Sequence, residues 1–142
     1  MKLKVKLDKW AKKPTRAHEH DCGLDLYAKV NMGVTEVPAY GSAEFDTGVH
    51  VAIPVGYSGD VKSKSGLMMM HDITTDGTVD PDYTGSILVK LFNHSCKAVV
   101  IRPGQKIAQL VIKAIITPEV ELTDNLEDTE RGNGGFGSTG MF

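Results

Sequence analysis

The residues near the C-terminus combine a cation, an aromatic ring and hydroxyl groups within one glycine-rich stretch. Residues 131–140 read Arg-Gly-Asn-Gly-Gly-Phe-Gly-Ser-Thr-Gly and include five glycines, one arginine and one phenylalanine. Because glycine loses more backbone freedom on ordering than any other residue, this stretch is predicted to be a mobile tail. Its cation, aromatic ring, hydroxyls and free backbone N–H groups suit a ligand that is both flat and anionic. A nucleotide has both properties.

Four internal segments hold further polar side chains that could act on such a ligand. They are 21–28 with Asp25, 62–67 with Lys64, Ser65 and Gly66, 77–85 with Asp80, Asp82 and Tyr83, and 104–110 with Gln109. A lysine, a serine and a glycine at a helix start offer a phosphate site through the helix dipole and free N–H groups. Taken alone, segment 62–67 is better explained as a capped helix with a solvated lysine.

The other three segments are also ambiguous one at a time. The strand period turns Asp25 away from the face of Leu24 and Leu26, and an aspartate beside a turn often simply faces solvent. A bare turn explains Pro81 and Gly85, but it does not explain the Val-Asp step directly before it. Gln109 interrupts an aliphatic strand, where an inward amide usually needs a partner.

The elements that must position these residues are predicted to be β-strands. Short Val- and Ile-rich runs, separated by Gly, Pro, Asn or Asp about every ten residues, occur at 2–7, 24–30, 49–53, 57–62, 86–94, 98–101 and 107–116. This spacing is typical of a β-sandwich, jelly roll or barrel. Only 65–71 is predicted to be helical, with Ser65 as N-cap and the three methionines 68–70 as adaptable core packing.

The chain is expected to form one β-rich domain over residues 1–122, followed by a flexible lid over 123–142. An acidic patch (Asp124, Glu127, Asp128 and Glu130) leads into the glycine-rich end. A net charge of -2 gives no general attraction to nucleic-acid polymers or acidic membranes. Cys22 and Cys96 form no C-x-x-C pair, and the N-terminus has no continuous apolar run. We expect a cytoplasmic protein without a membrane segment.

Read together and in order, the five segments resemble the motifs of the trimeric deoxyuridine triphosphatases, or dUTPases. Asp-Cys-Gly-Leu-Asp-Leu-Tyr-Ala at 21–28 is similar to the first motif, and Lys-Ser-Gly-Leu at 64–67 to the second. Gly-Thr-Val-Asp-Pro-Asp-Tyr-Thr-Gly at 77–85 resembles the third, Gly-Gln-Lys-Ile-Ala-Gln at 104–109 the fourth, and 131–140 the fifth. Five motifs in register are far more specific than any one of them.

The resemblance implies a jelly-roll or β-clip-like subunit that forms a threefold homotrimer, with each active site built from several chains. A closed ring makes such shared sites geometrically natural. It also implies hydrolysis of dUTP to dUMP and pyrophosphate, with Mg²⁺ across the triphosphate and water attacking the α-phosphorus. That reaction limits uracil incorporation into DNA and supplies dUMP for thymidylate synthesis.

The resemblance also assigns roles to individual residues. Asp80 would orient and deprotonate the attacking water, and Tyr83 would leave no room for a ribose 2′-hydroxyl. Asp25 would hold magnesium through water. The other implied substrate-binding residues are Thr74, Gly77, Thr78 and Val79 for uracil, Lys64, Ser65, Gly66 and Gln109 for the phosphates, and Arg131, Phe136, Gly137 and Ser138 from the tail.

Some positions depart from the family pattern, and other functions compete with it. Lys64 stands where the second motif commonly has arginine, and lysine lacks the planar two-pronged grip of arginine. The dCTP deaminases have a similar third motif, but they need a catalytic glutamate where this chain has Lys90. A non-catalytic β-trimer that binds nucleotide or protein is a further alternative. A metal site at His18, His20 and Cys22 is another, although a surface loop explains these residues better.

Overall fold

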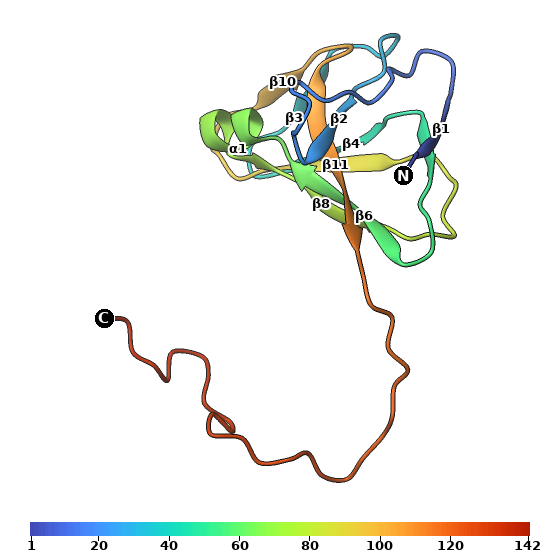
Figure 1. Cartoon of the computed structure of the whole chain (residues 1–142). Coiled ribbons are helices and arrows are strands. Elements are labelled where there is room, and N and C mark those ends of the chain that lie inside the picture. The colour runs from blue at the N-terminus through green and yellow to red at the C-terminus, as the bar shows by residue number, and fades with distance from the viewer.

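The computed structural model describes residues 1–142 and consists mainly of short antiparallel strands (Figure 1). The strands are β1 (Lys4–Leu7), β2 (Gly23–Tyr27), β3 (Thr35–Val37), β4 (Ser42–Asp46), β5 (Val49–Ala52), β6 (Tyr57–Ser63), β7 (Ile73–Thr74), β8 (Asp76–Val79), β9 (Leu88–Asn93), β10 (Val99–Ile101) and β11 (Lys106–Ala114), with one helix, α1 (Ser65–His71). The sheets have the orders β2-β11-β6-β8, β4-β9-β7, β1-β5 and β10-β3. The all-β prediction with one short helix is confirmed.

The strands that the sequence predicted are those rich in Val, Ile and Leu. β3, β4, β7 and β8 were not predicted, because their sequences (TEV, SAEFD, IT and DGTV) contain acidic, small or glycine residues that disfavour strands. These strands form because neighbours pair with them. β4 and β7 flank β9, and β8 pairs with β6. Pairing with an established strand thus outweighs weak local propensity.

The core lies between the sheets and contains a cluster of 18 buried residues. β9 shows the regular alternation, with Val89, Leu91 and Asn93 inward and the residues between them outward. β11 breaks this alternation, because the adjacent residues Ile107 and Ala108 are both buried. The register of β11 against β2 shifts between Lys106 and Ala108. This β-bulge changes which side chains of β11 share a face.

Helix α1 differs from the sequence prediction in two respects. Its N-cap position is occupied by Lys64, not Ser65, and no side chain makes a capping hydrogen bond. Leu67 is its only buried residue, whereas Met69 and Met70 are 76% and 77% exposed. The prediction that the methionines pack in the core was therefore wrong for this chain. On this short helix Leu67 packs inward, and the methionines that follow it face solvent.

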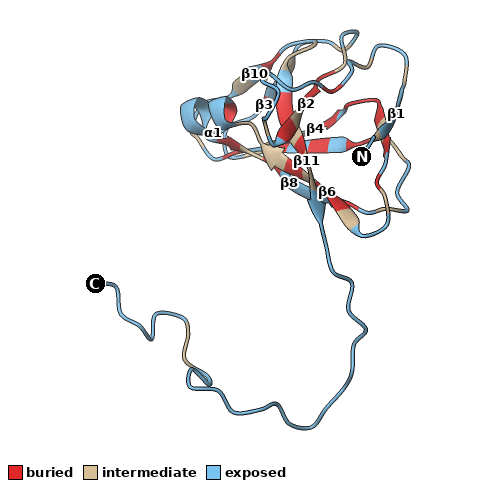
Figure 2. Ribbon diagram, in the orientation of Figure 1, coloured by how far each residue is buried: buried red, intermediate tan, exposed pale blue.

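The C-terminal segment leaves the β body after β11 (Figure 1). Ile115 still donates its N–H to the Gly56 carbonyl, and no later residue joins a sheet. The segment beyond it is exposed almost throughout, in contrast to the buried strands (Figure 2). The chain's one helix is too short to cross a membrane.

Candidate active site

One group of predicted site residues surrounds Asp25 in β2. Asp25 is 3% exposed, and its Oδ1 lies 2.5 Å from Lys64 Nζ. Its Oδ2 lies 2.7 Å from Lys106 Nζ, a contact that the sequence did not predict. Burial tends to raise the pKa of Asp25, but hydrogen bonding and charge from Lys106 and Lys64 outweigh it and hold the pKa below its usual value. Asp25 is therefore an ionised carboxylate between two ammonium groups.

The bulge in β11 explains how this group is assembled. Lys106 pairs with Tyr27, whereas Gln109 pairs with Asp25. Three residues apart on a regular strand, Lys106 and Gln109 would point to opposite faces. The extra residue at the bulge places both on the face of Asp25. The grouping of Lys106 and Gln109 beside Asp25 thus depends on the β-bulge, which the alternation of side chains in the sequence does not reveal.

Gln109 is held firmly at this site. Its Nε2 donates to the Ser63 carbonyl at 3.1 Å. Its Oε1 occupies the space that a side chain at position 23 would need, since a Cβ added to Gly23 would lie 2.3 Å from that oxygen. Glycine at position 23 therefore leaves room for the Gln109 side chain in its observed position. The expected partner for the inward amide is confirmed, and it is backbone.

Ser65 and Gly66 follow Lys64 at the start of α1, and both are exposed. A Cβ added to Gly66 would meet no atom of this chain within 4 Å. Packing within the subunit therefore gives no reason for glycine at this position. The residues predicted to contact phosphate lie on open surface beside the Asp25 group.

A second group lines a cavity of about 240 Å³ beside β8. Its lining residues are Val61, Gly77, Thr78, Val79, Asp80, Tyr83, Ile87 and Leu88. The structure thus brings together the third-motif residues predicted to bind uracil, the sugar and the attacking water. Most of the lining residues are apolar, and Asp80 and Tyr83 are exposed residues among them.

Tyr83 is held in one orientation by the turn that contains it. Its hydroxyl donates to the Ser86 carbonyl at 2.8 Å, and its backbone N–H donates to the Asp80 carbonyl. The ring lies over Gly85, where an added Cβ would come within 2.5 Å of the tyrosine oxygen. Gly85 is therefore required for the ring position. Ser86 is fixed as well, because its hydroxyl donates to Asp46.

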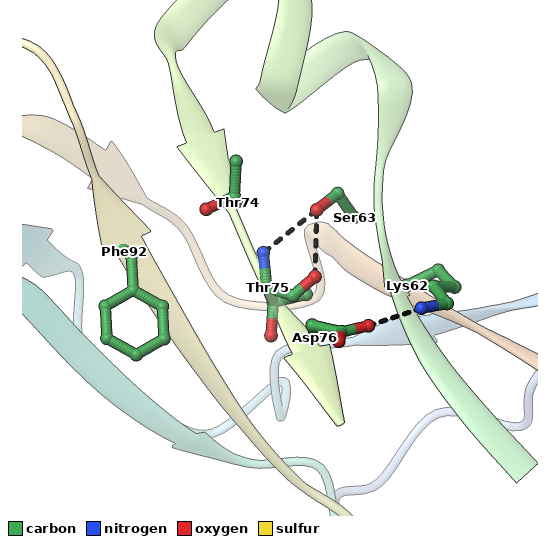
Figure 3. Close-up of a pocket in the computed structure, with 6 residues that line it drawn as sticks. All are labelled: Lys62, Ser63, Thr74, Thr75, Asp76 and Phe92. Atoms are coloured by element: carbon green, nitrogen blue, oxygen red, sulfur yellow. Dashed lines mark hydrogen bonds and ion pairs between the residues drawn. The ribbon is translucent and has the colours of Figure 1, made fainter. Parts of the chain in front are cut away.

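Thr74 lines a different cavity, of about 540 Å³, together with Lys62, Ser63, Thr75, Asp76 and Phe92 (Figure 3). Ser63 bonds to the backbone of Thr75 on one side of this cavity, and Lys62 pairs with Asp76 nearby (Figure 3). The Thr74 hydroxyl is hydrogen-bonded to His94 Nε2 at 2.7 Å. Within one chain, Thr74 is not part of the Asp80 and Tyr83 cavity.

The Asp25 group and the Asp80 group lie toward opposite ends of β6. In the β6–β8 register, Gly59 pairs with Val79, next to Asp80, while Lys62 pairs with Asp76 at the other end. From Gly59 to Lys64 is five residues, roughly 17 Å at about 3.3 Å per residue. One chain therefore does not bring the two groups into contact.

Residues 131–138 of the tail contact neither the Asp25 group nor the Asp80 group of the same chain. Arg131 Nε donates to the Gly134 carbonyl at 2.7 Å, which closes a small local turn. Phe136 is fully exposed, and Gly137 and Ser138 are exposed beside it. In Figure 1 this segment lies well away from the strands.

The structure gives less support to two alternatives considered from the sequence, a metal site at residues 18–22 and a deaminase site at position 90. No group of three or more His, Cys, Asp or Glu side chains in residues 1–142 is arranged to hold a metal ion, and this includes His18, His20 and Cys22. Lys90 is an exposed residue of β9 that pairs with Glu44 of β4. Lysine at position 90 cannot act as the carboxylate proton shuttle that deamination needs.

Comparisons with known proteins agree with this arrangement. The β architecture is the jelly-roll-like fold of dUTPase structures, as shown by the Staphylococcus bacteriophage 80alpha dUTPase solved with dUpNHpp, which has a TM-score of 0.88 at 30% identity over 98% of each chain. The dUTPase family model matches residues 9–140. The chain therefore belongs to the dUTPase family.

Two further relatives are informative. The deoxyuridine 5′-triphosphate nucleotidohydrolase of Gloeothece citriformis is 45% identical over 99% of this chain and 98% of its own. A mutant dUTPase from phage phi11 of S. aureus, 26% identical with a TM-score of 0.79, covers 90% of this chain and 100% of its own and was solved to show the coordination of a structural Mg(II) ion.

Proposed function

We propose that this protein hydrolyses dUTP to dUMP and pyrophosphate. The observation that carries the proposal is the small cavity that joins the Gly77–Asp80 backbone, the Asp80 carboxylate and the fixed Tyr83 ring. The cavity measures about 240 Å³ and is proposed to hold the nucleoside part of the substrate. With the nucleoside in this cavity, Asp80 in its lining would lie beside the first phosphate. Family membership points to the same reaction.

Each part of this cavity has a proposed role. Asp80 accepts the proton of the attacking water, because a general base must lie within hydrogen-bonding reach of that water. The N–H and C=O groups of residues 77–79 read the edge of uracil. Tyr83 excludes a 2′-hydroxyl, and its hydrogen bond to Ser86 and its packing on Gly85 prevent the ring from moving aside.

The triphosphate would bind at the other group of residues. Lys64, Ser65 and Gly66 supply an ammonium group and exposed N–H groups, and Gln109 contributes its amide. The donor set does not fit a metal ion caged by protein, because Asp25 is its only carboxylate. It fits an ion that the phosphates coordinate and Asp25 contacts through water, as Mg²⁺ often is in proteins. When bound, magnesium neutralises charge that develops on the phosphates.

The separation of the two groups supports a site shared between subunits. The α-phosphorus attacked near Asp80 and the phosphates held by Lys64 belong to one short triphosphate, whereas the two residues lie at opposite ends of β6. A second copy of the chain that places its Lys64 group beside the first copy's Asp80 would complete the site. We propose a threefold homotrimer, because a closed ring repeats one such contact three times.

The tail would act as a lid on this shared site. Phe136 would stack on uracil, while Arg131, Ser138 and the N–H group of Gly137 bind the terminal phosphates. Ordering about eight residues costs on the order of 8–16 kcal/mol in backbone entropy, so closure requires both contacts. We also propose a cytoplasmic setting, which the two free and exposed cysteines support.

The decisive experiment is an assay of pyrophosphate release from dUTP, with UTP and dCTP in parallel, each with and without magnesium. The proposal requires turnover of dUTP that magnesium stimulates and that UTP and dCTP do not match. Ammonia released from dCTP would instead identify a deaminase. Tight nucleotide binding without any product would support a non-catalytic β-trimer.

A further inference from the structure

Two lysine ammonium groups lie beside the single carboxylate of Asp25, although one would be enough to neutralise its charge. Lys64 Nζ and Lys106 Nζ lie 2.5 Å and 2.7 Å from its two oxygens, while the residue is almost fully buried. One lysine would neutralise the carboxylate, so the three side chains together carry a net charge of about +1. This surplus charge lies next to residues 65 and 66, where phosphate is proposed to bind.

The two lysines are not equivalent. Lys64 lies in the connection between β6 and α1, outside any strand, and donates a hydrogen bond to Asp25 Oδ1. Lys106 begins β11 at the bulge and is held there by pairing with β2. Its ammonium forms an ion pair with the other carboxylate oxygen, Oδ2. Lys64 therefore directly precedes residues 65 and 66, where phosphate is proposed to bind, whereas Lys106 lies within the sheet.

We propose that Lys106 is a positioning residue that allows Lys64 to change partners when substrate binds. In the empty site Lys64 binds Asp25; when the triphosphate arrives, Lys64 moves to the phosphate oxygens and Lys106 keeps Asp25 paired. This inference rests on the proposed function. Removing the only partner of a buried charge is strongly destabilising, so a site with one lysine would resist the exchange. With two lysines, each anion has a cation before and after binding.

The exchange also gives a reason for lysine at position 64. An arginine there would grip the carboxylate through two parallel hydrogen bonds, which fix both direction and distance. The ammonium of Lys64 is a compact charge with three rotatable donors on a flexible stem, so it can turn from Asp25 to a phosphate oxygen and still donate hydrogen bonds. The departure of this chain from the usual second motif thus agrees with partner exchange.

The test measures affinity by titration calorimetry without magnesium, so that any contact of Asp25 with the metal does not contribute. The ligands are dUpNHpp, which has three phosphates, and dUMP, which has one. Lys106→Met should weaken dUpNHpp binding by about tenfold or more, because Lys64 is then held by Asp25, and should leave dUMP binding unchanged. Lys106→Arg should restore dUpNHpp binding. Lys113→Met is the matched control, since Lys113 lies in the same strand and pairs with Asp60 at 2.8 Å.

A second variant separates partner exchange from direct contact between Lys106 and phosphate. In the Lys106→Met background, Asp25→Asn removes the carboxylate that holds Lys64, so dUpNHpp affinity should return to near the wild-type value. Asp25→Asn alone should bind dUpNHpp without magnesium at least as tightly as the wild type. This single variant tests the inference even where Lys106→Met does not fold.

Three results would overturn the inference. Lys106→Met could behave like Lys113→Met, the double variant could stay as weak as Lys106→Met, or Asp25→Asn alone could lose affinity without magnesium. In each case a wild-type protein that still binds dUpNHpp and turns over dUTP would leave the proposed function standing. A wild-type protein that binds neither nucleotide would instead overturn the proposed function and this inference with it.

Discussion

The Asp80 side chain makes no hydrogen bond within the chain, so replacing it tests its role in the reaction without disturbing the fold. Asp80 is exposed and follows β8 directly, and its backbone carbonyl, not its carboxylate, accepts the hydrogen bond from Tyr83. Asp80→Asn should therefore leave the fold unchanged and lower kcat by roughly 10²- to 10⁴-fold, the contribution typical of a general base. Steady-state kinetics with dUTP measure this loss, and circular dichroism checks the fold.

The control for this variant lies two residues further on. Asp82 is an exposed carboxylate in the same turn that does not line the Asp80 cavity. Asp82→Asn should keep kcat within about threefold of the wild type, because it removes similar charge without removing the base. Equal losses in the two variants would show that the charge of the turn matters and not the position of Asp80.

His50 in β5 contacts both Thr84, in the turn beside the site, and Asp8, which follows β1. Making both hydrogen bonds at once requires a protonated imidazole. Its Nδ1 lies 2.8 Å from the Thr84 carbonyl and its Nε2 lies 3.1 Å from Asp8 Oδ1. Both partners only accept, whereas a neutral imidazole has a single N–H. The hydrogen bond to Thr84 and then the Asp8 side chain raise the pKa of His50 above 6.5.

The sign of the pH effect follows from this shift. A pKa that is higher in the folded state contributes stability that is fully present below the unfolded value and is lost as pH rises through the folded value. His50→Gln should therefore lower Tm more at about pH 5.5 than at about pH 8.5. His20→Gln, at an exposed loop position, should show no such trend. A His50→Gln deficit that is constant with pH would contradict a protonated link.

At the scale of elements, the tail can be removed without disturbing the strands. Truncation after Glu130 deletes the exposed fifth motif and leaves β11 and its contacts unchanged. We expect an unaltered Tm and a fall of about a hundredfold or more in kcat/KM for dUTP, because the lid contacts form after the nucleotide has bound. Truncation after Gly140 removes only Met141 and Phe142 and serves as control. Unchanged kinetics after the longer truncation would mean that the tail is not a lid.

The sequence predicted elements well where side-chain patterning alone determines them. The strands with regular Val, Ile and Leu alternation and the helix at 65–71 were located, because local patterning and burial agree there. β8 was missed as a strand because Asp-Gly-Thr-Val forms only by pairing with β6. At the candidate site, the motifs pointed to Asp25, Lys64 and Gln109, and the structure places these three residues in one group. The contact of Lys106 with Asp25 was not predicted, because it depends on the bulge at 106–108, where the adjacent residues Ile107 and Ala108 are both buried.

At the scale of the whole molecule, the tail is long enough to reach a site on its own chain or on another subunit of the proposed trimer. Phe136 follows the end of β11 at Ala114 by 22 residues, which can span roughly 70–80 Å when extended. That reach exceeds the roughly 17 Å between the two groups of site residues several times over. Tail length therefore does not restrict the lid to its own chain. The strand register, in contrast, keeps Asp80 and Lys64 apart in every copy.

This fixed separation predicts complementation between two inactive proteins. In the proposed homotrimer, the Asp80→Asn and Lys64→Met proteins should each have little activity, because every site lacks one of the two groups. After equal amounts are unfolded together and refolded, a site is complete when its Asp80 comes from one variant and its Lys64 from the other. Random assembly makes about a quarter of the sites complete, so about a quarter of wild-type dUTP turnover should return. If both residues of a site came from one chain, no mixture would recover activity. Pyrophosphate release before and after mixed refolding, with each variant refolded alone as control, decides between the two.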